Sequence, residues 1–251
     1  MIRLLMKADD LGYSEAVNHG IERAVRAGLI RSVGLMPAME AAVHGAGLLR
    51  GYDIALGMHT CICAGAPVSR PGDVPSMVDG NGLFKTSSVY RAGTGDFVRY
   101  EDAEREVTAQ LERFRAIVGR DPDYFEGHAV ASDAFFQALR DVAAREGLRL
   151  SMPALAEPEV AHIGGTAVRR CRVNSLDADY DPRLTLERAV SEAPEGSTNL
   201  YTCHPGYLDD YILTHSTLTV NRTRELAMLC DPGTRSWLEG RGVSLIDYRD
   251  L

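Results

Sequence analysis

Two aspartates and three histidines lie where short apolar stretches of the sequence end. They are Asp9, Asp10, His59, His128 and His204. In parallel α/β folds the carboxyl ends of the strands meet at one edge of the sheet, and functional groups gather there. If the apolar stretches are strands, these five side chains should converge at one rim.

Such a set of side chains fits a divalent metal centre. Two imidazoles and one carboxylate form a facial ligand set that leaves coordination positions open for water and substrate. A second carboxylate outside this set can act as a general base, and a further imidazole can act as a general acid. Together these groups make a metal-assisted hydrolase. Zinc suits this set best, while the sequence leaves cobalt, manganese, nickel and magnesium open.

Each of these residues also has a purely structural interpretation. Asp9 and Asp10 alone are compatible with a polar turn before a helix, and a single histidine such as His59 or His128 often only forms hydrogen bonds. Their joint occurrence at predicted strand ends favours the functional interpretation. Four other histidines lie in helix or loop contexts and are interpreted as structural or surface residues: His19, His44, His162 and His215.

The elements that must position these residues alternate along the chain. Apolar stretches predict strands over 2–8, 30–36, 53–59, 124–127, 148–151, 167–173, 199–203 and 243–246. Helical spacing predicts helices over 15–27, 39–50, 101–118, 133–146, 184–193, 222–230 and 234–240. This order predicts an α/β fold with a parallel sheet covered by helices.

About seven strand–helix units favour a distorted or incomplete (β/α) barrel, similar to a TIM barrel, over an open doubly wound sheet. Because the sequence contains no linker or repeat, we expect a single domain over 1–251. The segment 60–95 is rich in Gly, Pro and Ser and has little periodicity. Long irregular segments are often functional, so this one is expected to cover the substrate.

The composition excludes several classes of protein. The 251 residues include 27 Lys and Arg against 35 Asp and Glu, so the net charge is −8 and nucleic-acid binding is not expected. Neither a Walker A sequence nor a G-x-G-x-x-G motif after a strand occurs. No apolar stretch approaches the roughly 20 residues of a membrane span, and no signal segment is evident. A soluble cytoplasmic protein is expected, with a homodimer as the commonest assembly.

The five cysteines do not suggest a disulfide framework. Their number is odd and no C-x-x-C pair occurs, which favours a reducing compartment. Cys61 and Cys63 form a C-x-C pair that could hold a metal ion. A thiolate site usually needs more ligands nearby, so both are interpreted as small apolar loop residues.

The most specific motif is KADDLGYS at 7–14, followed by VNHGI at 17–21. Further stretches follow in a fixed order: 28–33, 56–59, 74–79 with Gly82 and Phe84, 204–207, 222–226 and 242–248. Together these stretches cover nearly the whole chain. They resemble the YdjC-like family of carbohydrate deacetylases, which includes the chitooligosaccharide deacetylases.

The resemblance implies a distorted (β/α) barrel that removes the acetyl group from N-acetylated sugars. The family pattern implies the following metal ligands: Asp10, His59 and His128. It also implies that Asp9 is the base. His204 of the HPGY stretch lies at the site by the same pattern, and its role as the acid is our own inference. Arg222 and Tyr207 are assigned to substrate binding, although packing explains Tyr207 equally well.

One stretch departs from the family pattern. The family usually has a run of the type Asp-Ser-His-x-His-x-His at the third metal ligand, whereas this chain has EGHAVAS at 126–132. The first histidine is retained as His128, Glu126 replaces the aspartate, and the later histidines are absent. Because the ligand triad is preserved, catalysis is still expected. The usual substrate contacts, and chitobiose as the sugar, are not implied.

Two other kinds of function remain compatible with the sequence. Another metal-dependent barrel enzyme, such as a phosphoesterase or an isomerase, shares the metal site but does not release acetate. The other is a non-catalytic sugar-binding relative that retains the barrel. Such a protein would be free to lose the predicted site residues, so their presence argues against it: Asp9, Asp10, His59 and His128. The sequence specifies neither the sugar nor its phosphorylation state.

Overall fold

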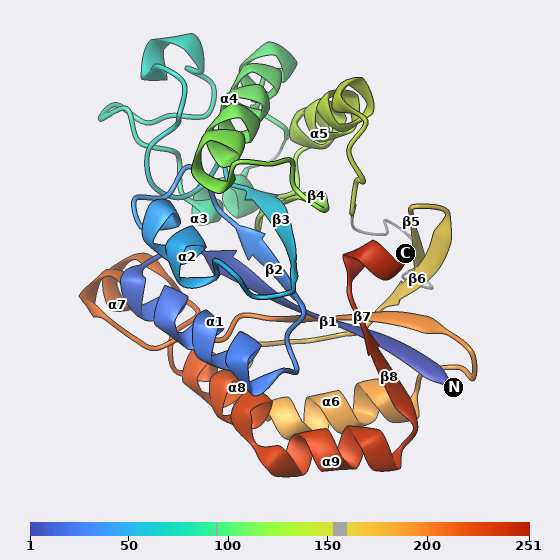
Figure 1. Cartoon of the computed structure of the whole chain (residues 1–251). Coiled ribbons are helices and arrows are strands. Elements are labelled where there is room, and N and C mark those ends of the chain that lie inside the picture. Colours follow the sequence, from blue (N-terminus) through green and yellow to red (C-terminus); the bar gives the residue numbers. More distant parts are fainter. Residues whose placement is uncertain (94, 153–159) are drawn as a thin grey trace.

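A curved sheet forms the centre of the molecule, which is represented by a computed structural model describing residues 1–93, 95–152 and 160–251 (Figure 1). In these residues the strands are β1 Ile2–Leu11, β2 Ser32–Leu35, β3 Ala55–Thr60, β4 Phe125–Gly127, β5 Val160–Ile163, β6 Thr166–Arg170, β7 Thr198–Cys203 and β8 Val243–Ile246. Their order is β4-β3-β2-β1-β7-β6-β5, and β8 pairs with β1. The order places β4 and β5 at opposite ends of the sheet. The expected incomplete (β/α) barrel is therefore confirmed.

The strand β1 organises this sheet. Its first half pairs with β8 from Ile2 to Leu5, and its second half pairs with β2 from Lys7 onward. On its other side it pairs with β7 over six residues. All pairs are parallel except the β5–β6 hairpin. Residues 4–11 are buried, as expected for a parallel strand covered on both faces.

Helices cover the two halves of the sheet (Figure 1). The described residues contain α1 Glu15–Ala27, α2 Ala42–Leu48, α3 Ser87–Ala92, α4 Tyr100–Val118, α5 Asp133–Glu146, α6 Pro182–Ser191, α7 Asp210–His215, α8 Val220–Cys230 and α9 Pro232–Gly240. Figure 1 shows α4 and α5 beside β3 and β4, whereas α1, α8, α6 and α9 form a layer along β1 and β7. In the described part of the chain, no helix combines the length and the apolar character needed to cross a membrane.

Local sequence signals explain the helix that follows the first strand. The Ser14 side chain accepts a hydrogen bond from the Val17 N–H and so caps the start of α1. Gly28 adopts a φ of 86°, which ends the helix in the left-handed conformation that glycine tolerates best. Val17 and Ile21 are fully buried on the face that packs against the core. The helix predicted over 15–27 is confirmed.

Three local predictions differ from the structure. Residues 148–151 form no strand; a single bridge joins Leu150 to Phe125. The strand expected over 167–173 is one arm of the β5–β6 hairpin, whose turn contains two glycines with positive φ. The irregular segment 60–95 contains the short helix α3 and a 3-10 turn at Pro71–Asp73. Short elements lack the periodicity on which sequence prediction depends.

Candidate active site

A bulge at the end of β1 brings two consecutive aspartates to one site. In a regular strand Asp9 and Asp10 would point to opposite faces. The register with β2 shifts between Ala8 and Leu11, so the chain is irregular at the aspartates. Asp10 has a φ of 74°, a strained conformation for a residue with a side chain. A β-bulge re-aims side chains, and here both carboxylates reach the neighbourhood of His59.

Asp10, His59 and His128 come from three parts of the fold, β1, β3 and the residue after β4. Asp10 Oδ1 lies 3.6 Å from His59 Nε2 and 3.2 Å from His128 Nδ1. The two ring nitrogens lie 3.0 Å apart. One ligand atom from each residue falls within 4.8 Å of the others. The structure thus brings together the three predicted ligands.

The chemistry of this cluster fits a divalent cation. Asp10 Oδ1 is buried and has no hydrogen-bond partner among the described residues. Burial alone would lower the pKa of His59, but Asp9, Asp10 and Glu126 raise it well above its usual value. The surrounding carboxylates therefore favour a positive charge at this point. A cation among one carboxylate and two imidazoles supplies that charge and satisfies the orphaned oxygen.

A second set of charges fixes the orientation of His59. Glu126 Oε1 lies 3.0 Å from His59 Nδ1, and Glu126 Oε2 lies 2.5 Å from Lys7 Nζ. Lys7 Nζ also lies 3.1 Å from Asp9 Oδ1. Burial alone would raise the pKa of Glu126, but Lys7 and His59 lower it to about 2. An ionised Glu126 accepts a hydrogen bond from the His59 Nδ1–H, so the lone pair of Nε2 is available for a ligand role.

Sequence reasoning missed this role for Lys7 and Glu126. Lys7 lies within a stretch that predicts an apolar strand, and Glu126 is a departure from the family pattern. A charged residue within a stretch that is otherwise buried was the available signal, because a buried charge requires a partner.

Arg222 holds the other oxygen of Asp10. Its Nη2 lies 2.7 Å from Asp10 Oδ2, and its Nε donates to the Leu218 carbonyl at 2.9 Å. Burial alone would raise the pKa of Asp10, but the charges of Arg222 and His128 hold it well below its usual range. The guanidinium thus positions a predicted metal ligand. Arg222 also lines a cavity, which is compatible with the predicted substrate contact. That contact stays a prediction.

Two cavities open on either side of this cluster. One of about 460 Å³ is lined by Asp9, His59 and Arg170, among others. The other, of about 470 Å³, is lined by Asp10, Arg91 and other residues of β1, α3 and the loop around α7. His128 and His204 line both cavities.

His204 lies on a loop that packs closely against α1. Its N–H donates to Glu225, and its ring Nδ1 is buried without a hydrogen-bond partner in the described ranges. A Cβ on Gly20 of α1 would lie 2.5 Å from Gly206 Cα, so glycines are needed where the two segments meet. This contact fixes the loop two residues after His204, whose side chain lines both cavities.

Tyr207 lies apart from the other predicted site residues. Its hydroxyl accepts a hydrogen bond from Arg23 Nη1 at 2.7 Å, and 38% of the residue is exposed. It is not among the residues that line the two cavities next to the metal-ligand cluster. The structure therefore places Tyr207 on the outer surface of the loop and does not bring it to the cluster.

The fold is shared with solved structures of low sequence identity. A structure from Enterococcus faecalis V583, described as that of a cellobiose-phosphate cleavage protein, has a TM-score of 0.81 at 22% identity and covers 99% of this chain and 98% of its own. A family 4 acetyl xylan esterase from Clostridium thermocellum has a TM-score of 0.54 at 9% identity, covering 99% and 89%. These likenesses define the class of fold.

The family follows from the sequence comparisons. The family model described as YdjC-like protein matches residues 3–240, so the chain belongs to the YdjC-like family and the predicted resemblance is confirmed. A carbohydrate deacetylase from Geobacillus stearothermophilus is 33% identical and covers 98% of this chain and 97% of its own length. A chitooligosaccharide deacetylase from Serratia marcescens is 28% identical, with 99% and 98% covered.

Proposed function

We propose that this protein is a metal-dependent hydrolase that removes the acetyl group from an N-acetylated sugar. The relatives that match along almost their whole length are carbohydrate deacetylases, which are hydrolases of amide C–N bonds. The observation that carries the proposal is the buried cluster of Asp10, His59 and His128 between two cavities, with Asp9 beside it.

The metal ligands in this proposal are Asp10 Oδ1, His59 Nε2 and His128 Nδ1. Zinc matches one carboxylate and two imidazoles, and magnesium or another divalent ion is the alternative. When bound, such an ion acts as a Lewis acid toward water and the acetyl carbonyl. Glu126 and Arg222 keep the first two ligands in their orientations.

Asp9 is the general base in this proposal. Its Oδ1 is buried and has no hydrogen-bond partner in the described ranges, although Lys7 Nζ lies 3.1 Å away. Its Oδ2 lies 3.9 Å from His59 Nε2, next to the proposed metal position. A carboxylate so placed can take a proton from the attacking water at the start of the reaction.

His204 is the general acid in this proposal. It lines both cavities, and its Nδ1 makes no hydrogen bond to a described residue. Expulsion of a sugar amine requires a proton on the departing nitrogen. A protonated imidazole at the junction of the cavities can donate it.

The substrate would occupy one or both cavities beside the cluster. Small side chains of Ala129 and Ala131 line the first cavity, where the usual histidine-rich run is absent. The second cavity is bordered by α3, which belongs to the segment predicted to cover the sugar. The five free cysteines agree with action in the reducing cytoplasm. A homodimer stays an expectation.

Acetate release tests the proposal. Purified protein would be incubated with N-acetylated sugars from monosaccharide to oligosaccharide, free and phosphorylated, after chelation and again after zinc is added back. We expect acetate only with metal and only from some members of the panel. If no sugar released acetate while a metal ion was bound by Asp10, His59 and His128, the proposal would fail and a different metal-dependent reaction would be favoured.

A further inference from the structure

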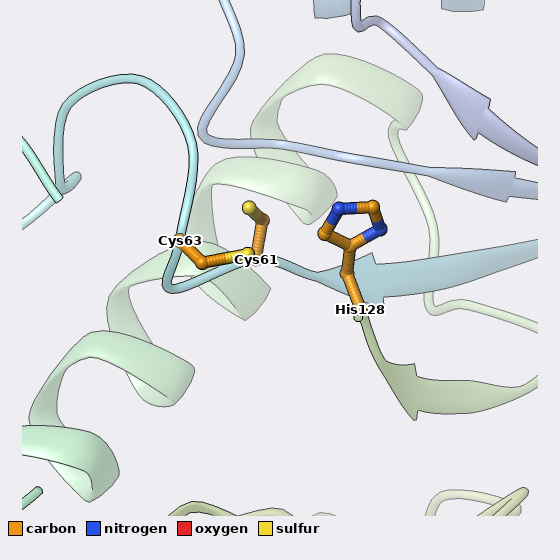
Figure 2. Close-up of side chains that lie close together, drawn as sticks. All are labelled: Cys61, Cys63 and His128. Carbon is orange, nitrogen blue, oxygen red and sulfur yellow. The ribbon is translucent and has the colours of Figure 1, made fainter. Parts of the chain in front are cut away.

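Two buried thiols lie beside the ring of His128. One ligand atom each of Cys61, Cys63 and His128 falls within 4.8 Å of the others. Figure 2 shows both sulfurs on one side of the imidazole, with a ring nitrogen facing the Cys61 sulfur. Cys61 is fully buried and Cys63 is 6% exposed. The C-x-C pair lacks a third ligand in the sequence, and the fold supplies one from the end of β4.

The backbone that carries the thiols is held in place. Gln110 of α4 accepts a hydrogen bond from the Cys61 N–H at 3.1 Å and donates to the Cys61 carbonyl at 2.6 Å. The Tyr90 hydroxyl donates to the Ile62 carbonyl at 2.8 Å. The Cys61 thiol itself makes a weak contact, 3.8 Å from the Ala64 carbonyl. The backbone on both sides of Ile62 is therefore held by contacts that need no ion.

The donor types select the kind of ion. Two thiolates and one imidazole are soft or borderline ligands, which zinc accepts and which magnesium, calcium and manganese disfavour. Two cysteines and one histidine are a known zinc set that leaves a fourth position open, with zinc–sulfur distances of about 2.3 Å. Each thiol loses its proton when the ion binds.

We propose that Cys61, Cys63 and His128 form a second metal site, specific for a thiophilic divalent cation such as zinc, which competes with the first site for His128. The His128 Nδ1 lies against Asp10 and His59. A neutral imidazole has one lone pair, so the ring serves one ion at a time. An ion at the thiols leaves the first site with two ligands and weakens it. This inference does not depend on the reaction proposed above.

Cadmium titration of the metal-free, reduced protein tests the site, with ultraviolet thiolate-to-cadmium absorption as the readout. The wild-type chain should reach its full signal at one equivalent, and the variant with Cys61→Ser and Cys63→Ser should give none. Cys230→Ser is the matched control and should keep the full signal. Asp10→Ala should also keep it, because that change removes a ligand of the first site only. A signal that persists without Cys61 and Cys63, or no signal in the wild type, would overturn the proposal.

A second measurement needs no variant. Cadmium K-edge X-ray absorption of the wild-type chain with one equivalent bound reports the elements around the ion. The proposal predicts two sulfur neighbours and one histidine nitrogen. A first shell of nitrogen and oxygen alone would place the ion at Asp10, His59 and His128 instead, and the thiol site would be refuted.

Discussion

Asp9 and Asp10 are consecutive aspartates, and the different side chains that contact them give them different roles in this account. Arg222 holds Asp10 Oδ2 at 2.7 Å, so Oδ1 faces the imidazoles. Asp9 has Lys7 as its cation, 3.1 Å away, and borders the first cavity. The sequence predicted the pair from its place after a strand. It could not predict the two cations, because Arg222 is 212 residues away from Asp10 and Lys7 lies inside an apolar stretch.

Glu126→Gln tests the orientation of His59. The glutamine keeps the size of the side chain but removes the charge that pairs with Lys7 and holds the His59 Nδ1 proton. We expect zinc affinity to fall about 10- to 100-fold, as for other partners of metal-bound histidines. Competition titration with a chelator measures the change. Glu112→Gln, on the exposed side of α4, is the control, and equal affinities in the two variants would contradict the role of Glu126.

His204→Ala tests the proposed acid. Because His204 is not a ligand in this account, zinc content should stay at the wild-type value. Turnover should fall about 10²- to 10⁴-fold, the usual contribution of a general acid. Metal analysis and kcat on the same sample give both values, with His162→Ala on the exposed strand β5 as the control. Full turnover in His204→Ala would remove this residue from the mechanism.

At the scale of elements, β1, β2 and β3 position two of the three predicted metal ligands, Asp10 and His59. Asp10 on β1 and His59 on β3 flank β2, which contributes Gly34 between them. A Cβ on Gly34 would lie 3.1 Å from both Asp9 Oδ1 and His59 Cβ. The glycine therefore leaves the space in which the side chains of the two outer strands meet.

Gly34→Ala should disturb the site more than the fold. The added methyl group crowds Asp9 and His59, so zinc affinity should drop at least tenfold, which corresponds to about 1.4 kcal/mol. Calorimetric titration with zinc measures the affinity, and thermal melting checks the fold. Gly47→Ala on α2 is the matched control, because a Cβ there meets no atom within 4 Å. Unchanged zinc binding in Gly34→Ala would show that the cluster tolerates the methyl group.

The predictability of each element depended on how local its signals are. The helix α5 was predicted with its observed bounds because Ser132 and Gly147 cap it within one segment. The bulge in β1 depends on the register with β2, which no local pattern records. The hairpin arm β5 is mostly exposed and lacks an apolar stretch, so it escaped prediction.

At the scale of the molecule, the incomplete barrel decides which distant residues meet. Placement at strand ends was enough to predict that Asp10, His59 and His128 converge. It was not enough for Tyr207, since its neighbour His204 faces the cavities while Tyr207 turns to Arg23 on α1. The third ligand for the cysteine pair, His128, directly follows β4, and only the sheet order reveals that β4 lies beside β3.

The central claim is that Asp9 is the base and Asp10 is a metal ligand. Its most direct test measures zinc content and acetate release, with one active N-acetylated sugar, in the wild type, Asp9→Asn and Asp10→Ala. We predict that Asp9→Asn binds one zinc ion but loses turnover by about 10²- to 10⁴-fold. Asp10→Ala should lose activity together with the zinc held by Asp10, His59 and His128, because it removes a ligand of that site; any zinc that remains should be bound by Cys61, Cys63 and His128. If Asp9→Asn instead lost its zinc and regained activity with added metal, the assignment of base and ligand to these two aspartates would be contradicted.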